Sequence, residues 1–165
     1  MLFFNITALH LAAEHNNLDI INFLICQQSI DLRLPIFKGC KKLTRIVLPF
    51  SLLKIENFAF YGCSSLKEIS IPASVTSIGS FASKCSSLVE LNIPSSVKEL
   101  GNNSFSRCSS LLNISIPMHV TYIEDYTFFK CLSLEKISFC SDVVSIGEYA
   151  FYECWNLTKI EIPPN

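Results

Sequence analysis

Cysteines are the residues of this sequence whose side chains offer the clearest chemistry, and there are eight of them. A thiol can form a disulfide, bind a metal as a thiolate or act as a nucleophile. Six of them stand 23, 22, 23, 23 and 23 residues apart: Cys40, Cys63, Cys85, Cys108, Cys131 and Cys154. Disulfide frameworks have uneven spacing and zinc sites use closely spaced pairs such as Cys-x-x-Cys, which is missing here. We therefore predict that these six, the rung cysteines, are reduced, buried and structural.

Cys26 and Cys140 fall outside this series. Cys140 stands where the other repeats have proline, so it is the stronger candidate for a reactive thiol, and a cysteine-based redox or thiol enzyme is the alternative function. His15 and His119 have no carboxylate or nucleophile at a helpful spacing, and the HExxH, GxSxG and phosphate-loop motifs do not occur. We predict a protein that is not an enzyme and has no catalytic residue, cofactor or metal site.

Apolar residues follow the rung cysteines with the same period. Leucine stands three residues after each cysteine, and an Ile-x-Ile type alternation begins six residues after it, as at Ile69 and Ile71. Alternation with a period of two predicts a short strand, and the proline that follows ends it because it has no N–H to donate. A Val-x-x-Ile segment then predicts a second buried face. Phenylalanine three residues before the next cysteine is predicted to fill the centre of each turn.

One repeat, between Cys63 and Cys85, is a residue short. When Ile78 is kept in register, Ser83 falls where the other repeats have the central phenylalanine. We expect a local cavity at this turn, costing about 3 to 5 kcal/mol, unless Phe81 turns inward to fill it.

The repeating pattern Cys-x-x-Leu-x-x-Ile-x-Ile-Pro-x-x-Val-x-x-Ile-Gly-x-x-Ala-Phe-x-x-Cys, found within residues 37–165, resembles the BspA-like, or Treponema pallidum-type, leucine-rich repeats. The resemblance implies an α/β solenoid, a right-handed coil with a parallel sheet on its concave side. The family is associated with cell-surface antigens of bacteria and parasitic protists that bind host matrix proteins or other cells. The implied function is therefore a protein-protein interaction module with a role in cell adhesion.

The segment from Thr7 to Ile25 resembles one ankyrin repeat, with Thr7, Leu9 and His10 in its turn and Asn16 where glycine is usual. We divide the chain into an ankyrin-like helical hairpin over residues 1–32 and a leucine-rich-repeat domain of about five turns over residues 33–165. A lone ankyrin unit does not bury its own faces. It is either the last unit of a truncated array or a cap on the N-terminal edge of the solenoid, and a non-functional fragment of a longer protein is a further alternative.

The net charge and the hydropathy of the sequence limit the classes of partner and the locations that we expect for the chain. Thirteen Lys and Arg against fourteen Asp and Glu leave a formal charge of −1, which gives no overall positive field for nucleic acid. No apolar run reaches the roughly 20 residues of a membrane-spanning helix, and the N-terminus lacks the pattern of a secretory signal. We expect an unidentified protein partner, no nucleic acid, and a cytoplasmic location for the chain as given. A surface location is the alternative if the chain is a fragment, and the oligomeric state stays open.

Two surfaces are candidates for binding a protein. The outward strand positions form two polar columns on the expected concave face: Arg45, Glu68, Ser70, Glu90, Asn92, Asn113, Lys136, Lys159 and Glu161. Aromatic residues outside the core columns gather on the expected convex side: Tyr61, Tyr126, Phe129, Tyr149, Tyr152 and Trp155. Exposed Tyr and Trp anchor many interfaces, whereas the alternative is that these rings fold back over neighbouring turns. A polar face kept only for solubility is the corresponding alternative for the strand columns.

Overall fold

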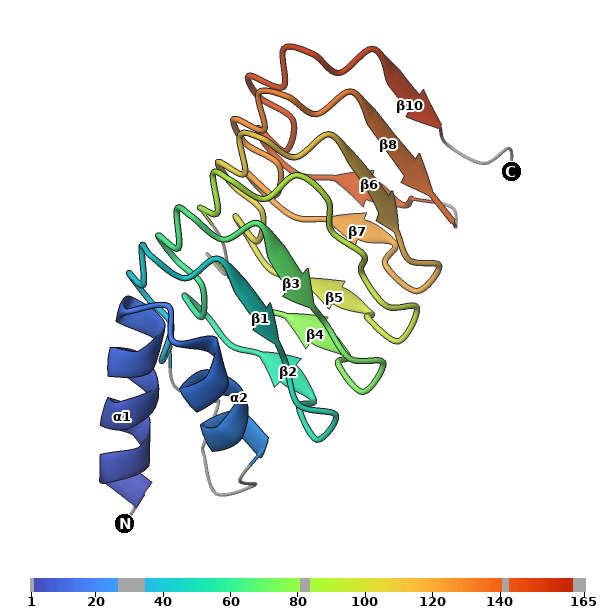
Figure 1. Cartoon of the computed structure of the whole chain (residues 1–165). Coiled ribbons are helices and arrows are strands. Elements are labelled where there is room, and N and C mark those ends of the chain that lie inside the picture. Colours follow the sequence, from blue (N-terminus) through green and yellow to red (C-terminus); the bar gives the residue numbers. More distant parts are fainter. Residues whose placement is uncertain (1, 27–34, 81–83, 141–142, 162–165) are drawn as a thin grey trace.

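The structure is a computed structural model that describes residues 2–26, 35–80, 84–140 and 143–161. Two helices, α1 (Leu2–Glu14) and α2 (Leu18–Cys26), form an antiparallel hairpin at one end of a coil of stacked turns (Figure 1). The C-terminal turn lies at the opposite end. This arrangement confirms the expected fold class, a solenoid preceded by a short helical hairpin.

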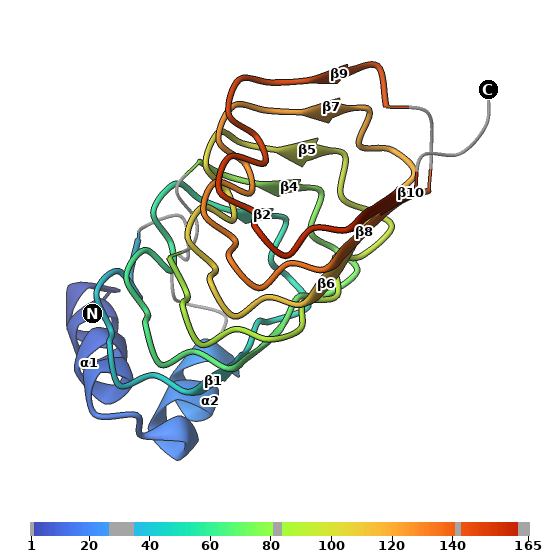
Figure 2. The same ribbon diagram turned by 90° about the horizontal axis from the view of Figure 1, so that it is seen from above.

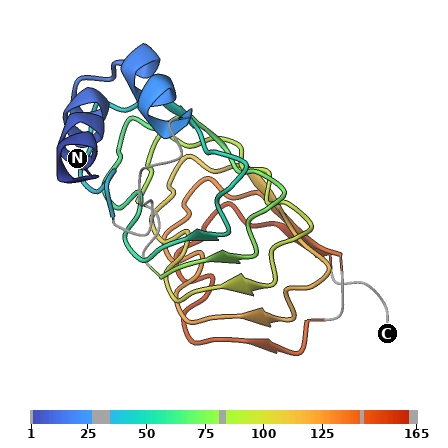
Figure 3. The same ribbon diagram turned by 90° about the horizontal axis from the view of Figure 1, so that it is seen from below.

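Ten short strands in the described residues form two rows, each on its own side of the coil (Figures 2 and 3). The first row comprises β1 (Arg45–Val47), β3 (Glu68–Ser70), β6 (Asn113–Ile116), β8 (Lys136–Phe139) and β10 (Lys159–Glu161). The second row comprises β2 (Lys54–Ile55), β4 (Ser77–Ile78), β5 (Glu99–Leu100), β7 (Tyr122–Ile123) and β9 (Ser145–Ile146). The second row arises from the Val-x-x-Ile segments, for which the sequence predicted burial but no strand.

Every strand pairing is parallel and joins equivalent residues of successive repeats. In the first row Ile46 pairs with Ile69, and Ile114 pairs with Ile137. The repeat containing Glu90 contributes a single bridge to Asn113 in place of a strand. Since the side chains of a strand alternate between its two faces, one side of the row enters the core and the other faces outward.

A third side of the coil carries turns and is called the turn face. Backbone N–H groups here bond carbonyls 22 residues later, as in Gly39 to Tyr61 (2.8 Å) and Arg107 to Phe129 (2.7 Å). Two columns of this face hold residues with positive φ. One column contains Phe58, Asn103, Tyr126 and Tyr149, and the other contains Gly39, Gly62, Lys84, Arg107, Lys130 and Glu153. The turns are therefore regular, although they contain no strand.

The core follows the predicted columns. Cys40, Cys63, Cys85, Cys108 and Cys131 are buried, Cys154 is partly buried, and all six thiols are free. The central phenylalanines stack from turn to turn, with ring centroids 5.4 Å apart for Phe37 and Phe60 and 5.6 Å apart for Phe105 and Phe128. A stack of parallel rings at this spacing gives each turn the same interior shape.

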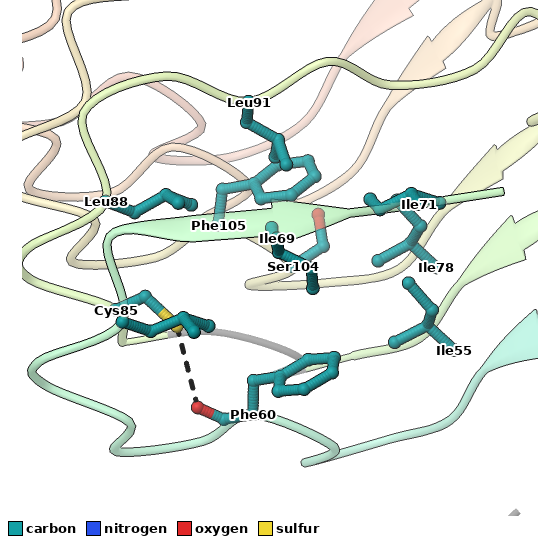
Figure 4. Close-up of a pocket in the computed structure, with 11 residues that line it drawn as sticks. Ile55, Phe60, Ile69, Ile71, Ile78, Cys85, Leu88, Leu91, Ser104 and Phe105 are labelled. Atoms are coloured by element: carbon teal, nitrogen blue, oxygen red, sulfur yellow. Dashed lines mark hydrogen bonds between the residues drawn. The ribbon is translucent and has the colours of Figure 1, made fainter. Parts of the chain in front are cut away.

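The stack is interrupted in the short repeat. A cavity of about 30 Å³ lies between Phe60 and Phe105, lined almost wholly by apolar side chains including Cys85 and Leu88 (Figure 4). This is the cavity expected where a repeat lacks its phenylalanine. Ile78 pairs with Leu100, 22 residues later, which places the missing residue between Ile78 and Cys85. Phe81 and Ser83 lie outside the described residues, so the predicted inward turn of Phe81 stays a prediction.

The helical hairpin packs on the first turn of the coil. Helix α2 contacts β1, and Leu9, Ala13 and Ile21 belong to the same buried cluster as the rung cysteines. Asn16 has a φ of 55°, as expected where ankyrin repeats usually have glycine, and its Oδ1 accepts hydrogen bonds from Thr44 N (2.9 Å) and Thr44 Oγ1 (3.0 Å). The packing supports the interpretation of the hairpin as a cap on the solenoid edge.

No helix within the described residues is both long and apolar enough to span a membrane.

Two candidate interaction surfaces

The outward side of the first strand row, called the first-strand face, carries the predicted polar columns. Eight of the nine predicted side chains are exposed, and the ninth, Glu161, lies in β10 with its side chain outside the described part. Strand register sets Arg45 beside Glu68, a bridge sets Glu90 beside Asn113, and Asn113, Lys136 and Lys159 follow one another in neighbouring strands. The register thus brings together residues that are far apart in the sequence.

Charge is unevenly distributed along this face. Arg45 Nη2 lies 3.2 Å from Glu68 Oε1, so these two exposed charges offset each other near the N-terminal end. At the other end the register sets Lys136 directly beside Lys159.

A hollow of about 440 Å³ opens in the middle of the first-strand face. It lies beside Glu90, where the strand row is reduced to one bridge. Its polar lining comes from four predicted residues and from two serines of the adjacent column: Glu90, Asn92, Asn113, Lys136, Ser115 and Ser138.

Five of the six aromatic residues predicted for the convex side lie on the turn face in two columns, and the sixth, Trp155, directly follows the rung cysteine Cys154. Tyr126 stacks on Tyr149 with centroids 5.2 Å apart, and Phe129 stacks on Tyr152 at 5.6 Å. Phe58 packs edge to face on Tyr61 at the other end of the face. The rings therefore do pack on neighbouring turns, but Tyr149, Tyr152 and Trp155 stay 53%, 50% and 74% exposed.

Cations interleave with these rings, and sequence reasoning missed them. Lys84 Nζ lies 4.4 Å from the Tyr61 ring centroid, Arg107 Cζ lies 6.0 Å from that of Phe129, and Lys130 Nζ lies 5.2 Å from the same ring. Cations over ring faces are held by the ring quadrupole. The signal was present in the sequence, because Lys84, Arg107 and Lys130 each stand immediately before a rung cysteine.

The rings and cations enclose a second hollow, the turn-face groove, with a volume of about 310 Å³. Its lining comprises Phe58, Tyr61, Lys84, Asn103, Ser106, Arg107, Tyr126 and Phe129. Lys84 Nζ donates a hydrogen bond to Tyr61 Oη at 2.5 Å. This hydrogen bond, together with the ammonium charge, lowers the pKa of the Tyr61 phenol and marks the groove as locally positive.

Four buried rung thiols, Cys40, Cys63, Cys85 and Cys131, have a raised pKa, whereas a hydrogen bond with Cys131 lowers the pKa of the partly buried Cys154. Burial, with a smaller contribution from the Glu14 carboxylate, raises the pKa of Cys40 to about 11. Burial is also the main reason that the pKa of Cys63 is raised to about 12. A raised pKa keeps a thiol protonated at neutral pH, whereas a nucleophile or metal ligand must be a thiolate.

His10 lies close to Cys40 without acting as its base. His10 Nδ1 is 2.6 Å from the Ile36 carbonyl oxygen and 3.8 Å from Cys40 Sγ, and Nε2 is 3.3 Å from Glu14 Oε1. Because a carbonyl only accepts, Nδ1 carries the proton that bonds Ile36, and it cannot take one from Cys40. The cluster instead ties α1 to the first turn.

Cys140 is exposed, with its sulfur 3.5 Å from Ser115 Oγ, and no described cation or imidazole forms a hydrogen bond with it. The Cys26 side chain lies outside the described part. Over the described ranges, no group of three or more His, Cys, Asp or Glu side chains could hold a metal ion.

The fold and these surfaces show that the chain is a solenoid repeat protein with rows of parallel strands. Proteins of this class offer extended surfaces for interactions. Residues 30–158 match the model of the BspA type leucine rich repeat region in six copies, and residues 4–35 match the ankyrin repeat model. The chain belongs to the BspA-type leucine-rich-repeat family. A comparison with curated proteins finds no match.

Solved structures agree with this assignment. The Treponema pallidum leucine-rich-repeat protein TpLRR is 30% identical with a TM-score of 0.61, over 75% of this chain and 69% of that one. A leucine-rich-repeat protein from Bacteroides ovatus is 29% identical with a TM-score of 0.64, over 81% of this chain but only 40% of its own length. The pneumococcal vaccine antigen PcpA, 23% identical with a TM-score of 0.56 over 74% of this chain and 36% of that one, shares the fold.

Proposed function

We propose that the chain is a non-enzymatic protein-binding module whose partner docks on the first-strand face. The observation that carries the proposal is the hollow around Glu90, where exposed side chains from neighbouring repeats converge on one site. A partner segment lying along this face meets an acid at Glu90, amides at Asn92 and Asn113, and ammonium groups at Lys136 and Lys159. Ordered polar and charged groups of both signs give register and specificity to a docked protein.

The hairpin and the coil have separate roles in this proposal. We assign residues 1–32 to a cap and residues 33–165 to the binding domain. We also propose that the parent protein displays this domain as a surface antigen or adhesin, because the family is associated with that role. Antibody staining of intact and permeabilised cells tests the location: staining of intact cells supports display, and staining that requires permeabilisation contradicts it.

The binding face is tested by reversing four charges together: Glu68→Lys, Glu90→Lys, Lys136→Glu and Lys159→Glu. Binding to a panel of immobilised extracellular matrix proteins is measured by biolayer interferometry. For any protein that the natural chain binds, we expect the variant to bind at least about tenfold more weakly, because opposed like charges across an interface repel.

The matched control reverses four exposed charges around the second strand row: Lys54→Glu, Lys98→Glu, Glu99→Lys and Glu124→Lys. We expect this control to bind like the natural chain. If the first-strand variant binds with the same affinity as the natural chain, the binding site is not on the first-strand face. If only the control variant loses affinity, the binding site is on the second strand row.

A further inference from the structure

The turn-face groove is a gap in the two aromatic columns. In the repeat that ends at Cys108, the ring positions hold Asn103 and Ser106 instead of aromatic residues, and the ring positions of the preceding repeat lie outside the described residues. The groove therefore has aromatic walls, with Tyr61 at one end and Phe129 at the other, and a floor of small polar side chains. Such a combination suits a ligand with both apolar and hydrogen-bonding groups.

Two cations line this groove without a described acidic partner. No described lining residue is Asp or Glu, and no described carboxylate lies within ion-pair distance of Lys84 or Arg107. By contrast, Lys130, in the equivalent position one turn later, pairs with Glu153 at 3.1 Å. The same position along the coil is thus neutralised outside the groove and left positive inside it.

We propose that the turn-face groove binds an acidic peptide segment, with Lys84 and Arg107 each receiving a carboxylate. Asn103 and Ser106 supply hydrogen bonds for the peptide backbone, and the edges of Tyr61 and Phe129 contact its apolar side chains. This inference rests on the proposed function in that the ligand is part of a protein, but it concerns a different face.

The ring contacts favour a peptide over a single-stranded nucleic acid. Single-stranded nucleic acids bind by stacking their bases on open aromatic faces. Lys84 lies over the Tyr61 ring, while Phe129 has Tyr152 stacked on it from the next turn and Arg107 over it from the preceding turn. The ring faces in the groove are occupied, whereas the ammonium and guanidinium groups are placed for isolated carboxylates.

The test uses two fluorescein-labelled synthetic peptides that alternate an acid with leucine and serine, one with Glu at the acidic positions and the other with Gln. Fluorescence anisotropy measures their affinity for the full chain. We expect the Glu peptide to bind and the Gln peptide to bind at least about tenfold more weakly. The double variant Lys84→Gln, Arg107→Gln should bind the Glu peptide about three- to thirtyfold more weakly than the natural chain, because it loses two exposed ion pairs.

The control variant Lys67→Gln, Lys98→Gln changes the net charge by the same amount at exposed sites outside the groove. Its affinity for the Glu peptide should equal that of the natural chain, and thermal melts show that both variants are folded. Equal losses in the two variants would overturn the inference, as would tighter binding of labelled oligothymidylate or of a sulfated oligosaccharide. If the chain binds a matrix protein but not the Glu peptide, the groove is not a peptide-binding site, whereas the proposed function still stands.

Discussion

The thiols of the rung cysteines fill small apolar sites and also donate weak hydrogen bonds to the preceding turn. Cys63 Sγ donates to the Phe37 carbonyl at 2.9 Å, and Cys131 Sγ donates to the Phe105 carbonyl at 3.2 Å. The sequence predicted the burial, because an apolar column with a fixed period requires a small residue. It could not predict the donor role, since the acceptor belongs to another turn and its distance depends on how the turns are stacked.

At the scale of single residues, we predict that the free energy of unfolding falls as the pH rises above about 9. The pKa of Cys63 is raised to about 12 by burial, so between these values the unfolded chain loses a proton that the folded chain keeps. Stability from this group is complete below pH 9 and declines by about 1.4 kcal/mol per pH unit above it. Urea unfolding at a series of alkaline pH values measures the slope.

The Cys63→Ala variant isolates this contribution. It should be less stable than the natural chain at neutral pH, by about 1 to 3 kcal/mol, because it loses buried volume and a hydrogen bond. Its stability should nevertheless fall less steeply with alkaline pH. An unchanged slope would mean that Cys63 is not a protonated thiol in the folded protein.

At the scale of elements, Asn16 joins the hairpin to the coil. An asparagine with positive φ keeps the turn between the helices, as the sequence predicted, and its acceptor also binds Thr44, 28 residues further along the chain. The second role was not predictable, because the ankyrin pattern describes only the hairpin. The exposed apolar residues Leu11, Ile20 and Phe23 of the hairpin lie outside the buried core.

We predict that Asn16→Gly, which restores the residue usual in ankyrin repeats, destabilises the chain by about 1 to 2 kcal/mol through the loss of both hydrogen bonds. Asn16→Asp keeps the acceptor oxygen and should lose less. Urea denaturation compares the two variants. A glycine variant at least as stable as the aspartate variant would show that the contact with Thr44 does not stabilise the cap.

The short repeat gives a second prediction at this scale. Ser83→Phe combined with one residue inserted after it should restore the phenylalanine stack and fill the cavity between Phe60 and Phe105. We expect a gain of about 0.5 to 2 kcal/mol and a higher melting temperature, because a filled cavity regains apolar contacts. A lower melting temperature would contradict the register that places the missing residue between Ile78 and Cys85.

Across the whole molecule, a periodic sequence made the fold and the polar columns predictable, because identical repeats that stack in register place equivalent residues side by side. The features that escaped prediction depend on the spacing between turns. The second strand row has strands of two residues, too short for an alternation to reveal, and Lys84 and Arg107 gain their role only beside rings of neighbouring turns. The hollow at Glu90 likewise depends on how neighbouring repeats lie side by side, and it coincides with the repeat that contributes a single bridge.

Hydrogen-exchange mass spectrometry of the chain with and without a bound matrix protein tests the central claim most directly, because it locates the partner on the coil. We predict slower exchange in the segments of the first strand row, above all around Glu90, Asn113 and Lys136, with unchanged exchange in the second row at β2, β4 and β5. Protection confined to the second row, or to the turn face alone, would contradict the assignment of the first-strand face as the binding surface.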